Sequence, residues 1–259
     1  TTEPTTETDG IITYTCKRCK HQDTKNLGKL GDGEPYIEGS FQKKGWDAVN
    51  DLIRASQEKD TISITLNGAK VLPATVLSEI KGKDISLNLD MENGFIWKIN
   101  GTSITAETPA DTDLSVTNTA EYIPAALYSL ISTNQNDFGF HLGRSGAFDF
   151  PAVLSVKADA SCAGLMANLF WYDAENGVLQ CIQTVTVGGA FERSIPYADF
   201  TLSKGQDYFI AFGTESLNGR VIHTDGSITD ENGAYLRPAD TKISSYSIDR
   251  NKLTVRLSK

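Results

Sequence analysis

Residues 61–99, TISITLNGAKVLPATVLSEIKGKDISLNLDMENGFIWKI, decide the fold class of this chain. Three segments in this stretch alternate apolar and polar residues, which is the period of a strand with one buried face. They are residues 62–66, 85–89 and 95–99. The turn Glu92-Asn93-Gly94 predicts a hairpin between the last two segments, because asparagine and glycine tolerate the backbone angles of tight turns. Pro73 and Gly82 bound a short predicted helix, since proline suits a helix start and glycine a helix end.

The same order of elements returns about 51 residues later. Leu114–Val116 predicts a strand, and Pro124 precedes a predicted helix over Ala125–Ile131. Phe138–Leu142 and Val153–Val156 then predict a second hairpin. Two strand-helix-hairpin units imply an internal duplication. We therefore expect a mainly β fold, with antiparallel sheets in a sandwich-like arrangement and a few short helices.

The chain is expected to divide into four parts. Residues 1–10 have the composition of a solvated Thr/Glu/Pro linker, which suggests that the chain was cut from a longer protein. Residues 11–44 predict a short hairpin carrying a CxxC motif, followed by a connector. Residues 45–110 form the first repeat unit. Residues 111–259 form the second unit and a region of hairpins, packed with the first as one module.

Composition and motifs exclude several classes of function. The formal net charge is -9, and no block of lysine or arginine could neutralise a phosphate backbone, so nucleic acid is not an expected partner. No apolar run approaches the roughly 20 residues of a membrane span, and no signal peptide begins the chain. The catalytic and cofactor signatures of hydrolases, phosphotransferases and dinucleotide enzymes are missing, so we expect no enzyme and no cofactor. Two close carboxylates would suffice for glycoside hydrolysis, which keeps that activity as a third, weaker hypothesis.

The four cysteines fall into two pairs of different character. Cys16 and Cys19, with His21 close by, supply half of a tetrahedral zinc site, which needs four ligands. A vestigial knuckle or a local disulfide is the preferred interpretation, so no bound metal is expected. Cys162 and Cys181 are expected to be buried free thiols, because a hairpin turn at 176–177 would place Cys181 opposite about Leu169.

Aromatic side chains are the candidate ligand-binding groups, since sugar rings stack on tryptophan and tyrosine. Trp171 and Tyr172 come first, because both faces of their predicted strand carry aromatic residues. Trp97 shares a strand face with Phe95 and Ile99, so core packing competes with stacking there. Trp46 lies on the apolar face of a helix expected over about residues 45–56, and is also expected to pack on a sheet.

Three stretches carry a resemblance to known proteins. GWDAVNDLI and LNGAKVLPATVLSEIKGKDISLNLDMENGFIWKINGTSIT, within residues 45–105, resemble a recurring module of clostridial surface proteins. FDFPAVLSVKADASCAGLMANLFWYDAENGVLQCI and YADFTLSKGQDYFIAFG, ending at Gly213, are similar to the later part of such modules. TYTCKRC and the Thr/Glu/Pro leader are similar to segments of modular, cellulosome-associated adhesion and carbohydrate-binding proteins of Ruminococcus-type clostridia.

The resemblance implies an extracellular, cell-surface-associated module without catalytic activity. It implies binding of a plant cell-wall or storage polysaccharide, such as cellulose, hemicellulose or starch, beside neighbouring modules of the same chain. The alternative is a structural spacer or protein-docking module of a surface adhesin, in which every tryptophan belongs to the core. Exposed coplanar aromatic residues would favour the first hypothesis.

Overall fold

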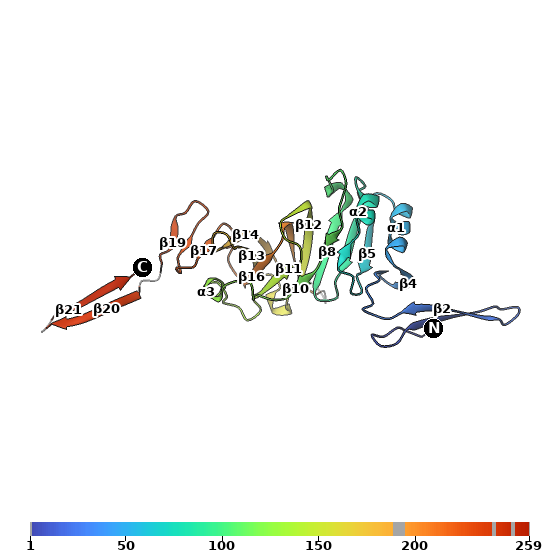
Figure 1. The fold of residues 1–259 in the computed structure, drawn as a ribbon, viewed down its shortest axis with the longest axis horizontal. Coiled ribbons are helices and arrows are strands. Elements are labelled where there is room, and N and C mark those ends of the chain that lie inside the picture. The colour runs from blue at the N-terminus through green and yellow to red at the C-terminus, as the bar shows by residue number, and fades with distance from the viewer. Residues whose placement is uncertain (1, 189–194, 240–241, 250–251, 259) are drawn as a thin grey trace. The chain divides into compact units, whose positions relative to one another are not determined.

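A computed structural model describes residues 2–188, 195–239, 242–249 and 252–258 (Figure 1). The fold is mainly β, with antiparallel sheets and a few short helices, which confirms the predicted class. The chain divides into two compact units, and it passes between them several times. Unit 1 comprises Thr1–Val116, Leu142–Lys157 and Asp199–Gly205, and unit 2 comprises Thr117–His141, Ala158–Ala198 and Gln206–Lys259. The sequence predicted contiguous parts at residues 45–110 and 111–259, whereas unit 1 also takes Leu142–Lys157 and Asp199–Gly205 from the second part.

Unit 1 is built on a seven-stranded sheet with the strand order β15-β12-β8-β7-β5-β3-β4. Its strands are β3 (Tyr36–Ile37), β4 (Ser40–Lys44), β5 (Thr61–Thr65), β7 (Ser86–Asp90), β8 (Phe95–Asn100), β12 (Ala147–Lys157) and β15 (Tyr197–Lys204). The predicted hairpin is present as β7 and β8, in a register that pairs Leu87 with Ile99. β5 and β7 run parallel, because helix α2 (Ala74–Ile80) carries the chain back across the sheet between them.

Two helices pack on this sheet and close its core. Helix α1 (Trp46–Ala55) and α2 lie beside each other in unit 1 (Figure 1). The apolar face of α2 is completely buried at Val76, Leu77 and Ile80. Strand β8 alternates buried and half-buried residues, as the sequence pattern predicts. Complete burial of an aliphatic side chain, as at these three positions of α2, stabilises the fold by about 1.5–3 kcal/mol.

The predicted duplication is wrong at the level of strand pairing. The second unit was expected to end in a hairpin, but its two strands belong to different sheets. β11 (Phe138–Leu142) pairs with β16 (Asp207–Gly213), whereas β12 pairs with β8. Helix α3 (Ala125–Tyr128) is a single turn and stops short of the predicted end at Ile131. Alternation indicates that a segment is a strand, but it does not select the partner, and distant apolar strands compete with the nearest one.

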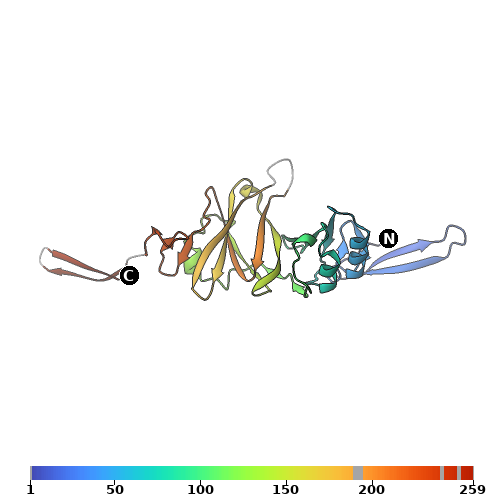
Figure 2. The same ribbon diagram turned by 90° about the horizontal axis from the view of Figure 1, so that it is seen from above.

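Unit 2 is built on an eight-stranded sheet with the order β10-β11-β16-β13-β14-β17-β18-β19, visible from a second side in Figure 2. Besides β11 and β16, its strands are β10 (Val116–Thr117), β13 (Met166–Asp173), β14 (Val178–Thr186), β17 (Val221–His223), β18 (Ile228–Thr229) and β19 (Tyr235–Arg237). The α3 region covers one face, where Leu127 and Ile131 join a buried cluster with Phe170, Phe209 and Ile222. Tyr128 stacks on Phe209, with ring centroids 5.1 Å apart.

Two hairpins complete the described chain. β1 (Gly10–Thr15) pairs with β2 (Gln22–Gly28), as predicted for the CxxC segment. β20 (Lys242–Asp249) pairs with β21 (Lys252–Ser258) at the end of the predicted region of hairpins. The expected linker does not run free, because Thr2 pairs with Ile11 and the Leu30 amide donates to the Thr5 carbonyl at 3.0 Å.

The smaller elements are β6 (Val71–Leu72), which pairs with β9 (Thr112–Asp113), and two 3-10 turns, Gly101–Ser103 and Ala160–Cys162. Within the described residues, every helix is too short or too polar to cross a membrane.

Candidate functional site

The candidate aromatic residues do not form one strip. Trp97 is only 1 % exposed, and its indole N–H donates to the Leu114 carbonyl at 2.9 Å, so the expectation that it binds ligand is wrong. Trp46 opens α1 and is half-buried beside the buried Val49. Core packing uses the faces of the Trp97 ring that a sugar would need.

Trp171 and Tyr172 are adjacent on β13 and point to opposite faces of the sheet of unit 2. Both are half-buried. Tyr172 packs against the same buried cluster as Phe170. Strand geometry therefore separates the two side chains, and they cannot form one continuous stacking platform.

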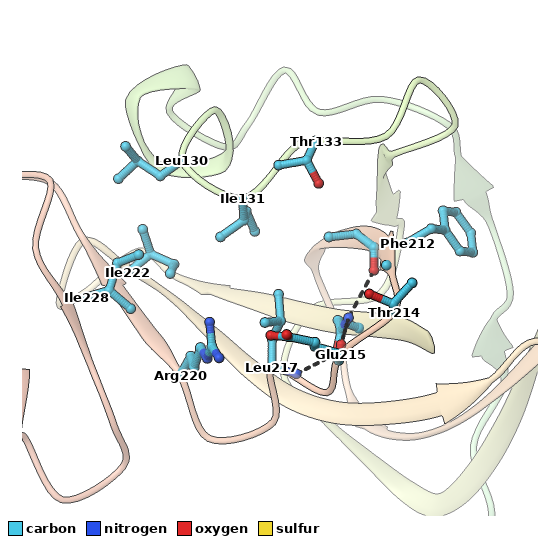
Figure 3. A pocket seen from close by; sticks show the side chains of 13 residues that line it. Leu130, Ile131, Thr133, Phe212, Thr214, Glu215, Leu217, Arg220, Ile222 and Ile228 are labelled. Carbon is cyan, nitrogen blue, oxygen red and sulfur yellow. Dashed lines mark hydrogen bonds between the residues drawn. The ribbon is translucent and has the colours of Figure 1, made fainter. Parts of the chain in front are cut away.

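A hollow of about 270 Å³ in unit 2 is the strongest candidate site (Figure 3). It lies between the segment that follows α3, the end of β16 with its following loop, and strands β17 and β18. Its lining residues are Leu130, Ile131, Thr133, Asn168, Ala211, Phe212, Gly213, Thr214, Glu215, Leu217, Arg220, Ile222 and Ile228. An apolar hollow with a few polar groups at its edge is the usual form of a small-ligand site.

The floor of the hollow is continuous with the core of unit 2. Ile131, Ala211 and Ile222 belong to the buried cluster, and Leu217 packs against it. Figure 3 shows the Ile131 side chain pointing into the hollow and the Phe212 ring pointing away from it. The floor therefore offers aliphatic carbon atoms rather than an aromatic ring.

Asn168 holds the loop that forms one wall. This side chain is 1 % exposed and lies on β13 below the loop. Its amide group donates to the carbonyls of Ala211 (3.3 Å) and Glu215 (3.1 Å). Its oxygen accepts from the Leu217 amide (2.8 Å) and the Thr184 hydroxyl (2.7 Å). A buried asparagine with all these bonds satisfied fixes one loop conformation.

Arg220 supplies the cationic group of the hollow. Its backbone is held in place, because its carbonyl accepts from the Cys181 amide at 2.8 Å and its amide donates to the Leu217 carbonyl at 3.0 Å. The side chain is half-buried and rises beside Leu217 and Ile228 (Figure 3). Among the described residues, no carboxylate forms a salt bridge with its guanidinium. Such a group can donate two parallel hydrogen bonds to a carboxylate or to vicinal hydroxyls.

The rest of the edge is polar and accessible. Thr133, Thr214 and Glu215 are exposed there. Hydroxyl and carboxylate groups at this edge can exchange hydrogen bonds with a ligand without losing bonds inside the protein. The hollow therefore suits a ligand with an apolar face, several hydroxyls and a negative charge.

The buried free thiols predicted at Cys162 and Cys181 are confirmed, whereas the local disulfide considered for Cys16 and Cys19 is not formed. Cys16 and Cys19 are exposed free thiols in the β1–β2 turn, and within the described chain no group of three metal-binding side chains gathers around them. Cys162 and Cys181 are buried free thiols. Cys181 lies opposite Phe170 rather than Leu169, because the loop spans residues 174–177 and Asp173 pairs with Val178.

Sequence reasoning missed the hollow because its residues come from segments far apart in the chain. A signal was present at Asn168, since an amide between apolar residues in a strand must find buried partners. Comparison with protein-family models, with curated proteins and with solved structures finds no match for this chain.

Proposed function

We propose that this chain is a non-catalytic, extracellular module that binds a plant polysaccharide at the hollow of unit 2. The observation that carries the proposal is Arg220, a half-buried guanidinium without a salt-bridge partner among the described residues, beside an aliphatic floor. A half-buried cation beside apolar side chains gains most from a ligand that replaces its hydrogen bonds to water.

A polysaccharide that contains uronic acid fits this chemistry better than a neutral one. Its carboxylate would pair with the guanidinium, and the C–H face of its ring would lie on the floor near Ile131 and Leu217. Its hydroxyls would bond to the polar edge at Thr133 and Glu215. Hemicelluloses with glucuronic acid side groups have all three features. Cellulose and starch lack the carboxylate.

Affinity gel electrophoresis tests this proposal. The protein is run through gels that contain glucuronoxylan, neutral xylan, cellulose derivative or starch. We expect retardation by glucuronoxylan, loss of retardation in Arg220→Gln, and normal retardation in Arg18→Gln. The second variant changes net charge by the same amount, but its exposed side chain lies in the β1–β2 turn. Retardation that survives Arg220→Gln and disappears in Trp171→Ala would move the site to β13.

A second candidate function is a structural spacer or protein-docking module. The burial of Trp97 favours it, since this ring already serves packing. Strand β19 lies at the edge of the eight-stranded sheet, with Tyr235 71 % and Leu236 56 % exposed, and edge strands can accept a strand from a partner. Migration unaffected by every polysaccharide would favour this function over glycan binding.

A further inference from the structure

The β1–β2 turn has the backbone geometry of half a zinc site. The Cys16 amide donates to the His21 carbonyl at 2.8 Å, and the Lys20 amide donates to the Cys16 carbonyl at 2.9 Å. These two bonds close a tight turn that brings Cys16 and Cys19 to its tip. Lys20 adopts a left-handed conformation with φ of 60°, which lets the chain reverse directly after the second cysteine.

Backbone amides of this turn face the sulfur of Cys16. The Cys19 amide nitrogen lies 3.5 Å from the Cys16 Sγ atom. The backbone amide of Arg18 also faces this sulfur. Amide donors to sulfur stabilise the thiolate, which is the form that binds metal. The turn is thus arranged for thiolate ligands before any metal arrives.

The turn by itself provides too few ligands for a structural zinc site. Zinc in such sites takes four nitrogen or sulfur ligands in a tetrahedron. Residues 13–26 are exposed throughout, and the described part of the chain brings no third metal-binding side chain to the two thiols. Two ligands must therefore come from outside this hairpin.

We propose that Zn²⁺ joins two copies of this chain at this turn, with Cys16 and Cys19 of each copy as its four ligands. A twofold axis through the metal would relate the two hairpins, and such pairing is the commonest symmetry of protein dimers. Each thiol releases its proton as the Zn–S bond forms, so zinc uptake releases protons and strengthens with rising pH.

The charges around the thiols suit a tetrathiolate centre. Four thiolates and one Zn²⁺ carry a net charge of -2, and Lys17, Arg18 and Lys20 of each turn place cations beside them. The excess positive charge of two facing turns is screened over about 8 Å at physiological ionic strength. This basic cluster contrasts with the net charge of -9 of the whole chain.

Zinc titration of the complete chain, kept reduced, tests the proposal by light scattering after size-exclusion chromatography. We expect the mass to rise from 28.2 kDa to twice that value, with one zinc bound per two chains by elemental analysis. Co²⁺ substitution should produce the thiolate charge-transfer and tetrahedral absorption bands. Cys16→Ser and Cys19→Ser should each abolish the doubling, while His21→Ala should keep it.

Three results from the parent chain and from Cys16→Ser would overturn the proposal. They are a monomer that binds one zinc per chain, a mass that zinc does not change, and a dimer that persists in Cys16→Ser. Loss of the doubling in His21→Ala would also overturn it, because His21 would then be a ligand. The variants sit in an exposed turn, so far-ultraviolet circular dichroism should show that each of them remains folded.

Discussion

Replacement of Asn168 by alanine should loosen the wall of the hollow more than any other single change to its polar groups. The variant removes four hydrogen bonds and leaves the Leu217 amide and two carbonyls without their partner. A typical buried hydrogen bond contributes about 1 kcal/mol net, and an unsatisfied buried group costs about 1–3 kcal/mol. Two of the four bonds exceed 3.0 Å, so we expect a total loss of about 3 kcal/mol for unit 2.

Thr184→Val is the matched control, since it removes only the hydroxyl that donates to Asn168 at 2.7 Å. The Asn168 oxygen still accepts from the Leu217 amide in that variant. We expect a loss of about 1 kcal/mol there.

Hydrogen exchange measured by mass spectrometry on peptides covering residues 213–217 follows the loop directly. A loss of about 3 kcal/mol corresponds to exchange about 100-fold faster, against about fivefold for the control. Equal exchange rates in the two variants would refute the assignment of the loop to Asn168. The glucuronoxylan affinity should fall in Asn168→Ala, because Arg220 follows the same loop.

Two further results are expected elsewhere in the molecule. The Lys44 ammonium donates to the Leu27 carbonyl at 3.0 Å and pairs with Asp32, so Lys44→Met should destabilise the base of the β1–β2 hairpin by about 2 kcal/mol, measurable by urea unfolding. Partial burial opposes ionisation of Asp32, but hydrogen bonds from Lys44 and the Glu34 amide outweigh it and lower the pKa of Asp32. This contribution to stability is present above the ordinary aspartate pKa of about 4 and is lost as the pH falls through the lowered value. The difference in unfolding free energy between Lys44→Met and the parent should therefore shrink in acid. A difference that stays constant with pH would contradict the pairing. Burial raises the pKa of Cys181 to about 11 and also raises that of Cys162. At pH 8 a thiol reagent should therefore modify the two exposed cysteines quickly, and all four cysteines only in urea. Fast modification of four thiols in the folded protein would refute the burial of Cys162 and Cys181.

Local sequence patterns predicted the elements of unit 1 well, for a physical reason. The alternation at 95–99 reflects a strand with one face against the core, and β8 is buried in that alternating pattern. The turn at Asn93-Gly94 and the start at Pro73 are likewise decided by backbone conformations that involve only neighbouring residues. The apparent repeat failed because its evidence was also local, whereas the pairing of β12 with β8 and of β11 with β16 is not.

Local patterns likewise predicted some properties of the candidate site residues, but they did not predict the hollow. The burial of Cys162 and Cys181 followed from the sequence, since these residues lie in or beside predicted core strands, whereas the free state of Cys16 and Cys19 did not. Whether a tryptophan is available to a ligand did not follow, because the Leu114 carbonyl and the packed sheet that cover Trp97 lie outside its own strand.

By itself, the sequence determined the mainly β class, the β1–β2 and β7–β8 hairpins and the burial of Cys162 and Cys181, because these depend on periodicity and turn chemistry within a few residues. Only the tertiary structure decided the division into two units, the sheet to which each strand belongs and the hollow around Arg220. Those features arise where segments such as 130–133, 168 and 213–220 meet. Their meeting depends on the free energy of packing the whole unit, which no local pattern encodes.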